Sequence, residues 1–194
     1  AQWTAKDDTA YTVKYFGYDG NGGWTVIKTE SLEGTTDETA EAEIKEFEGY
    51  TYYEAYADNK LSGKIAGNGS LVLEVYYSVN ATVNITGNCD TLKYDGTTQN
   101  VTGYELAATT EVKDVTYDVS KAAEITGDLN NASLVAETAA ISKIASGKDV
   151  GTYEMGLAAD QFRNTDPGFN VCFNLVSDGQ LEIIPRHVVL TSAD

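Results

Sequence analysis

Short runs of alternating apolar and polar residues, separated by glycine-rich turns, set the strongest limit on what this chain can fold into. The run YTVKYF at residues 11–16 alternates from side to side, and the turn-like GYDGNGG follows it before WTVIKTESL resumes the pattern at Trp24. Two such runs around a turn predict a β-hairpin. Thirteen Tyr and 18 Gly against two Pro and one Met also favour strands and turns over helices. We therefore expect a mainly β chain.

The segment 35–48, TTDETAEAEIKEFE, fits two different structures. Thr35 and Glu38 have the spacing of a helix-capping box, and the apolar residues from Ala40 to Phe47 fall on one helical face. The same alanines also alternate with glutamates, as in an edge strand. We favour a short helix or helical turn here and keep the edge strand as the alternative.

The spacing of the strand-like runs changes near Asn80. Beyond it, strand-like runs recur about every 8–12 residues and are divided by turns such as SDG and DPG, which is typical of a β-sandwich or barrel. The run SLVAETAAISKIA within this half is expected to form paired strands rather than a helix. We predict two modules, residues 10–80 and residues 81–185, with a short extension over residues 1–9.

The charge of the chain argues against several kinds of partner. Thirty acidic residues against 13 basic ones give a net charge of −17. A field of this sign repels nucleic acids and anionic membrane surfaces. No run reaches the 18 or more apolar residues of a membrane-spanning helix. We expect neither nucleic-acid binding nor membrane insertion for this segment, whose start at Ala1 fits a mature chain or an excised fragment.

Two sets of motifs resemble repeats of bacterial surface proteins. YTVKYF, EFEGYT and GNGSLVLEVYY in the first half resemble the MucBP-like repeats of Gram-positive cell-surface proteins, which implies a ubiquitin-like β-grasp fold for about residues 10–80. YDG, VTGY, DVGTYEMGL and SDGQLEIIP in the second half resemble, in that order, the MBG-type β repeats of adhesin-like proteins. That resemblance implies an antiparallel, sandwich-like module for residues 81–185.

Such repeats occur in tandem, and the resemblance therefore bears on the end of the sequence. A repeat of this kind closes on a strand like LEIIP, and the next opens with a run like RHVVLTSAD. Pro185 ends the hydrogen bonding of the last strand and stiffens a short link. Residues 186–194 are then expected to be a linker and the first strand of a missing next repeat. The resemblance also implies an extracellular location on the cell surface, with cell-wall attachment through other parts of the protein.

The residues that usually carry catalysis or bind metals are scarce. The single histidine, His187, lies in the expected linker, which argues against catalytic arrangements that need a histidine. Two cysteines and one histidine, widely spread, do not form a zinc-binding pattern, and no phosphate-binding glycine loop appears. Paired carboxylates carry little information in so acidic a chain. We predict that the chain is not an enzyme and that it needs no cofactor or metal.

Two covalent cross-links are suggested by the resemblance. Cys89 and Cys172 stand where the repeat pattern usually has other residues, and a paired departure in an exported protein favours a disulfide over two buried thiols. Adhesins of this type sometimes contain an isopeptide bond between lysine and asparagine. Lys14 and Asn80 are the candidates for such a bond, although ordinary surface roles for both are the stronger interpretation.

Tyrosines crowd the first module, and they carry the remaining site hypothesis. Exposed tyrosines can stack on sugar rings, and the candidates for this role are Tyr50, Tyr52, Tyr53 and Tyr56. Cross-strand packing of half-buried tyrosines is the simpler interpretation. The function that we predict is a structural spacer within an adhesin-like array, which contacts neighbouring repeats of its own chain. The alternative is the binding of mucin-type host or dietary glycans through the tyrosines of the first module.

Overall fold

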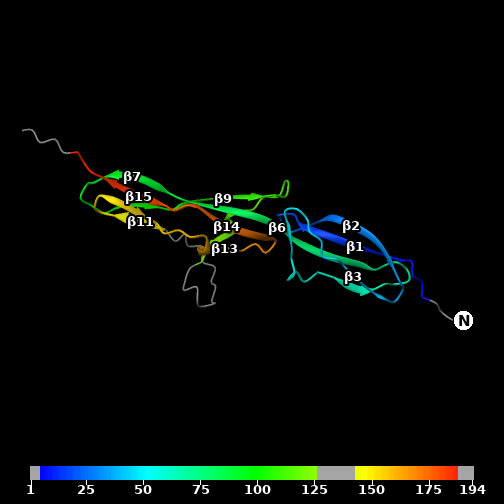
Figure 1. Cartoon of the computed structure of the whole chain (residues 1–194). Coiled ribbons are helices and arrows are strands. Elements are labelled where there is room, and N and C mark those ends of the chain that lie inside the picture. The colour runs from blue at the N-terminus through cyan, green and yellow to red at the C-terminus, as the bar shows by residue number, and fades with distance from the viewer. Residues whose placement is uncertain (1–4, 126–142, 188–194) are drawn as a thin grey trace, which may run out of the picture. The chain divides into compact units, whose positions relative to one another are not determined.

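A computed structural model describes residues 5–125 and 143–187 of the chain, which is mainly β (Figure 1). The chain divides into two compact units. The first unit comprises Ala1–Ala81, Thr109–Tyr117 and Asp166–Val171, and the second comprises Thr82–Ala108, Asp118–Thr165 and Cys172–Asp194. The chain thus first leaves the first unit one residue beyond Asn80, and later returns to it twice. Separate folding of residues 10–80 and 81–185 stays a prediction.

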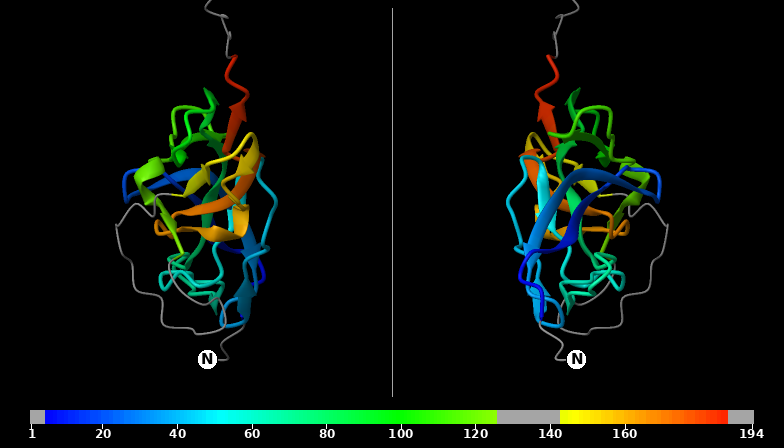
Figure 2. Two further views of the ribbon diagram at one scale, coloured as in Figure 1. Left: turned by 90° about the vertical axis from the view of Figure 1, so that its left-hand side faces the viewer. Right: turned by 90° about the vertical axis from the view of Figure 1, so that its right-hand side faces the viewer.

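The first unit is organised around its first strand. β1 (Thr9–Tyr18) pairs antiparallel with β2 (Trp24–Gly34) on one side and parallel with β6 (Val72–Gly87) on the other. The predicted hairpin is confirmed, and a register shift between Tyr15 and Phe16 accompanies the curvature of the two strands (Figure 2). In the turn, the Asp19 amide donates to the Gly23 carbonyl at 3.0 Å.

Three short strands complete the first unit. β4 (Tyr50–Tyr52) pairs antiparallel with β6, and β3 (Thr39–Glu41) pairs antiparallel with β5 (Ser62–Lys64). The preferred helix over residues 35–48 is therefore wrong, and the edge-strand alternative holds for Thr39–Glu41. Pairing with a distant strand overrides the local helix signals. The pairing continues past Glu41, since the Ala42 amide also donates to the Leu61 carbonyl at 2.7 Å.

β6 is a single strand of 16 residues, which the sequence pattern divides in two near Asn80. Every second residue from Leu73 to Ile85 is buried, which is the two-residue period of a strand with one face in a core. Within the first unit, its side chains pack with those of β1 and the short strands in one core. The members of this core are Val13, Tyr15, Ala40, Ile65, Leu71, Leu73, Val75 and Tyr77.

The second unit contains several small sheets around its own core. β15 (Gln180–Ile184) lies between β12 (Gly151–Glu154), with which it pairs antiparallel, and β7 (Cys89–Lys93), with which it pairs parallel. β8 (Gln99–Thr102) pairs with β11 (Ile144–Gly147), and β10 (Ala122–Glu124) pairs with β13 (Phe162–Asn164). β9 (Tyr104–Thr110) and β14 (Phe169–Ser177) pair with β6. The core members are Ile85, Val101, Ala145, Met155, Leu157, Phe162, Leu181 and Ile183.

Helical structure is minimal in the part of the chain that the structure describes. It consists of two 3-10 turns, η1 (Val119–Lys121) and η2 (Ala159–Gln161), and no described helix has the length and apolar character to cross a membrane. The strands predicted in the run SLVAETAAISKIA lie almost wholly outside the described residues, although β11 begins at Ile144. Most of the expected linker strand, residues 188–194, also lies outside them.

Candidate functional site

A hollow of about 300 Å³ on the first unit is lined by four aromatic side chains. We call it the aromatic groove. Its lining residues are Tyr18, Gly22, Trp24, Tyr53, Tyr56, Asp166, Pro167 and Gly168. Pockets that hold small molecules are usually apolar and aromatic, with a few polar groups that fix orientation. The groove has this composition, with the Asp166 carboxylate as its charged group.

The first pair of rings comes from the ends of the hairpin. Tyr18 and Trp24 are register partners across β1 and β2, and their ring centroids lie 5.4 Å apart in an edge-on arrangement. The turn between them is held by Asp19, whose Oδ1 accepts hydrogen bonds from the amides of Asn21 at 2.8 Å and Gly23 at 2.9 Å. These bonds favour the charged carboxylate and lower the pKa of Asp19. The turn therefore fixes the spacing of the two rings.

The second pair of rings lies on a loop that one asparagine holds in place. The Asn59 side chain donates to the Tyr53 carbonyl at 2.7 Å and accepts from the Tyr76 amide of β6 at 3.0 Å. The loop places the Tyr56 ring 4.5 Å from Trp24, and the Tyr53 ring 6.4 Å from Trp24. All the rings of the groove thus touch at least one neighbour, which forms a platform rather than a cage around a central space.

The third wall is a turn from much later in the chain. Asp166 Oδ1 accepts from the Gly168 amide at 3.0 Å, and the Gly168 carbonyl accepts from the Val79 amide of β6 at 3.0 Å. Gly168 is required here, because a Cβ on it would collide with the Tyr18 ring. The Tyr18 hydroxyl donates to Asp166 Oδ2 at 3.3 Å. Burial, and then the Asp166 charge, raise the pKa of Tyr18, which keeps the phenol protonated.

A second layer of rings supports the platform. Tyr76 lies 4.7 Å from Tyr56 and 5.1 Å from Trp24, and it stacks on Phe16 at 4.8 Å with an interplanar angle of 10°. Burial, and then the neighbouring Glu74, raise the pKa of Tyr76 to about 12. Only 8% of Tyr76 is exposed, so its ring supports the groove from beneath and is not part of its surface.

The structure divides the four tyrosines that the sequence singled out. Tyr53 and Tyr56 line the aromatic groove, whereas Tyr50 and Tyr52 pack against the core. The Tyr50 ring covers Gly17, where any Cβ would collide with it, and Tyr52 lies edge-on to Tyr77 with centroids 6.0 Å apart. Sequence reasoning missed Trp24, Tyr18 and Asp166. The glycine-rich turn between two aromatic residues was a signal for the first two, but nothing local pointed to Asp166.

The two cysteines are exposed free thiols in the structure, so the expected bridge between Cys89 and Cys172 is absent from it. Cys89 begins β7, which pairs with β15, and its Sγ lies 3.7 Å from the Asp178 carbonyl oxygen. Cys172 lies in β14, which pairs with β6. The two thiols therefore lie on strands with different neighbours, and no pairing brings them together.

The suggested isopeptide partners are also apart. Lys14 pairs with Glu74 on β6, six residues before Asn80, which corresponds to roughly 20 Å along a strand. Asn80 Oδ1 instead accepts hydrogen bonds from Thr51 Oγ1 at 2.7 Å and from Asn170 Nδ2 at 3.0 Å. This geometry contradicts the Lys14–Asn80 bond, because the parallel register of β1 and β6 fixes the separation.

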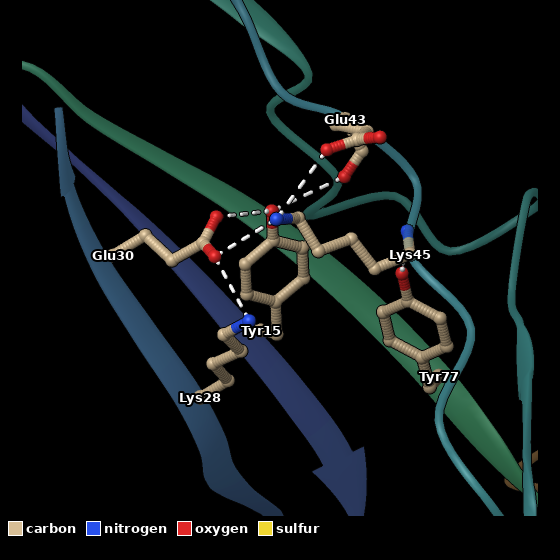
Figure 3. Close-up of polar contacts among 6 residues, drawn as sticks. All are labelled: Tyr15, Lys28, Glu30, Glu43, Lys45 and Tyr77. Atoms are coloured by element: carbon tan, nitrogen blue, oxygen red, sulfur yellow. Dashed lines mark hydrogen bonds and ion pairs between the residues drawn. The ribbon is translucent and has the colours of Figure 1, made fainter.

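A polar cluster surrounds Glu30 and includes the hydroxyl groups of the core residues Tyr15 and Tyr77 (Figure 3). Glu30 Oε1 pairs with the Nζ atoms of Lys45 at 2.8 Å and Lys28 at 2.9 Å, and its Oε2 accepts from the Tyr15 hydroxyl at 3.2 Å. The Lys45 amide donates to the Tyr77 hydroxyl at 3.0 Å. The cluster ties the irregular segment around Lys45 to β1, β2 and β6. All its charged groups are engaged with one another, which favours a structural role.

The ion pairs of this cluster shift the pKa of Glu30 strongly. The hydrogen bonds from Lys45 and then Lys28 lower that pKa to about 2 from an ordinary value of 4.5. A carboxyl whose pKa is lower in the folded state stabilises the fold above its ordinary pKa, and this contribution is lost as the pH falls toward the folded value. The window for this loss is therefore about pH 4.5 to about pH 2.

We expect Glu30→Gln to lower the melting temperature at pH 7, because the neutral glutamine side chain cannot form the ion pairs that Glu30 makes with Lys28 and Lys45. The difference between the variant and the original protein should shrink as the pH falls from about 5 to about 2, where the original Glu30 becomes protonated as well. Melting curves across this pH range measure the effect. Glu46→Gln, at an exposed position, is the matched control. A difference that persists unchanged at pH 2 contradicts the assignment.

Comparisons with protein-family models, with curated proteins and with solved structures find no significant match to this chain. Among the described residues, no group of three or more His, Cys, Asp or Glu side chains is placed to hold a metal ion.

Proposed function

We propose that the aromatic groove binds carbohydrate, and that the chain is a non-enzymatic segment of a bacterial cell-surface protein. The observation that supports carbohydrate binding is a platform of Trp24, Tyr53 and Tyr56 beside the Asp166 carboxylate. A sugar ring presents C–H groups on its faces, which pack on aromatic rings, and hydroxyl groups at its edge. A carboxylate accepts hydrogen bonds, and a sugar hydroxyl can donate one. Asp166, whose oxygens accept from Tyr18 and Gly168, lies in the lining of the groove beside the rings.

The packing of the rings favours a sugar over an organic cation. A cage for a quaternary ammonium group needs rings on opposite sides of a central space. Here Trp24 is 4.5 Å from Tyr56, and Tyr56 is 5.5 Å from Tyr53, so the rings fill that space themselves. A partly exposed platform, whose rings are tilted to one another by 36° to 52°, suits a ligand that lies across it. Binding at such a site is typical of a lectin-like module, and mucin-type glycans are the ligand class that we propose.

We expect Trp24→Ala to abolish detectable sugar binding and Asp166→Asn to weaken it. Trp24 is one of two tryptophans, so Trp3→Phe leaves it as the only reporter of indole fluorescence. A glycan array on the whole chain identifies the sugar. Fluorescence titration then gives the affinity of the proteins that keep Trp24, and titration calorimetry measures Trp24→Ala. Tyr94→Ala removes an exposed ring from the second unit and should bind like the original protein. Circular dichroism checks that each variant is folded. Failure to bind any glycan on the array contradicts the proposal.

We also propose that the chain acts as a structural spacer between the cell wall and more distal parts of its protein. The observation that favours this role is the position of β1 and β15, the first and last strands of the described fold. Each has a hydrogen-bonded strand on both sides, β1 between β6 and β2 in a six-stranded sheet and β15 between β12 and β7 in a three-stranded sheet. A β-grasp fold for the first unit and a sandwich-like fold for the second are part of this proposal. Antibody labelling of intact cells tests the surface location.

A further inference from the structure

We infer that the chain resists mechanical tension, and that β1 and β15 are the strands through which it does so. The inference rests on the spacer function proposed above, since a spacer in a surface protein is pulled at both of its ends. Within each unit, tension acts on the strand at which the chain enters or leaves. The direction of that strand relative to its partner decides whether their hydrogen bonds break together or one at a time. In its own unit, each of the two strands has one parallel and one antiparallel neighbour.

In the first unit, β1 has hydrogen-bonded neighbours on both sides. It forms ten residue pairs with β2 and six pairs with β6, from Thr12 opposite Val72 to Gly17 opposite Tyr77. A further bond runs from the Thr12 amide to the Leu71 carbonyl at 3.0 Å. Because β1 and β6 are parallel, tension pulls β1 toward its N-terminal end and β6 toward its C-terminal end. The two strands are therefore drawn in opposite directions along their lengths.

In the second unit, β15 occupies the corresponding position. It forms four residue pairs with β12 and five pairs with β7, from Gln180 opposite Cys89 to Ile184 opposite Lys93. The Tyr94 amide extends this parallel pairing with a bond of 2.9 Å to the Ile184 carbonyl. The chain first enters this unit ahead of β7, returns twice to the first unit, and reaches β15 as its last described strand. Tension again pulls two parallel strands in opposite directions along their lengths.

This direction of loading makes the strands hard to separate. When two strands slide past each other, all the hydrogen bonds between them must break together, whereas strands pulled apart from one end lose their bonds one at a time. Burial adds to the effect, because water cannot easily replace a bond that it does not reach. Val13 and Leu73 of the first pairing and Leu181 of the second have no exposed surface, and only 1% of Ile183 is exposed.

Single-molecule pulling can test the inference on the same folded protein with different attachment points. Cys89→Ser and Cys172→Ser remove the exposed thiols, so that only introduced cysteines react. Pulling from the N-terminus and the C-terminus loads β1 and β6 along their lengths. Pulling from Asn21→Cys, in the turn after β1, and from the C-terminus loads β1 and β6 at the same end and peels them apart.

We expect the first unit to rupture at a several-fold higher force when the chain is pulled by its two ends than when it is pulled from Asn21→Cys. A matched attachment exists for the second unit, at the exposed Thr98 after β7. Pulling from Thr98→Cys and the C-terminus should peel β15 from β7 at low force. Because forced unfolding follows the barrier along the pulling direction, this comparison does not depend on equilibrium stability. Chemical denaturation of the variants verifies that their stability is unchanged.

Equal rupture forces in the two geometries overturn the inference for the unit concerned. This result is distinguishable from failure of the spacer function, which is tested by labelling intact cells. High end-to-end forces support the inference even if the labelling places the protein elsewhere. If the labelling finds the protein on the cell surface but the rupture forces are equal, the spacer function is supported and the inferred resistance to tension is refuted.

Discussion

Gly87→Ala is expected to destabilise the second unit by about 3 kcal/mol, the upper end of the usual cost of overpacking. Gly87 ends β6, and a Cβ there would collide with the backbone nitrogen and Cα of Gly179 and lie 2.8 Å from the Asp178 carbonyl carbon. These are backbone atoms and cannot rotate away. The Gln180 amide, which donates to the Asn88 carbonyl at 3.0 Å, holds the two segments together.

Urea denaturation of Gly87→Ala should show a markedly lower midpoint, and thermal melting a loss on the order of 10 °C or more. Ser146→Ala is the matched control, because Ser146 is exposed in β11 of the same unit and its change should stay within about 0.5 kcal/mol. An unchanged midpoint for Gly87→Ala would show that the two backbones do not approach so closely.

Tyr77→Ala is expected to destabilise the first unit by about 3–5 kcal/mol, as for other large aromatic residues that are truncated in a core. Only 1% of Tyr77 is exposed, and its ring lies edge-on to Phe47 with centroids 5.1 Å apart. It also touches Tyr15 and Tyr52, at 6.4 Å and 6.0 Å. Removing the ring leaves a cavity beneath β4 and the segment around Lys45.

Tyr77→Phe separates the ring from its hydroxyl. This variant keeps the packing and loses only the hydrogen bond from the Lys45 amide, so its expected cost is about 1 kcal/mol. Tyr94→Ala, at a side chain that is 37% exposed, should change stability little. Urea midpoints of the three variants should therefore fall in the order Tyr77→Ala, Tyr77→Phe and Tyr94→Ala, from lowest to highest. Equal midpoints for the two Tyr77 variants contradict the cavity argument.

Much of the secondary structure could be predicted because its signals are local. The alternation of apolar residues gives a strand whenever one face is buried, and the sequence pattern located β1, β2 and β15 closely. The turn between β1 and β2 was equally clear from its glycines. The segment 35–48 shows the limit of such signals, because its helix pattern yields to strand pairing between Ala40 and Gly63.

The candidate site could be predicted only in part. The sequence pointed to tyrosines in the first half, and Tyr53 and Tyr56 do line the groove. The register between β4 and β6 decides which tyrosines face the core. A run of aromatic residues in the sequence does not specify that register. The cysteine and isopeptide hypotheses relied on composition and resemblance, and the strand partners of these residues lie elsewhere.

The sequence by itself determined that this chain forms strands, where most of them lie and which face of each is buried, since these properties follow from a two-residue period and from turn residues. Only the tertiary structure decided which strands are neighbours. It made β6 one strand, placed β1 and β15 between two partners each, and brought Asp166 to Tyr18 across 148 residues. The reason is that strand pairing and a composite groove depend on contacts between distant segments, and no local pattern encodes the partner of a strand.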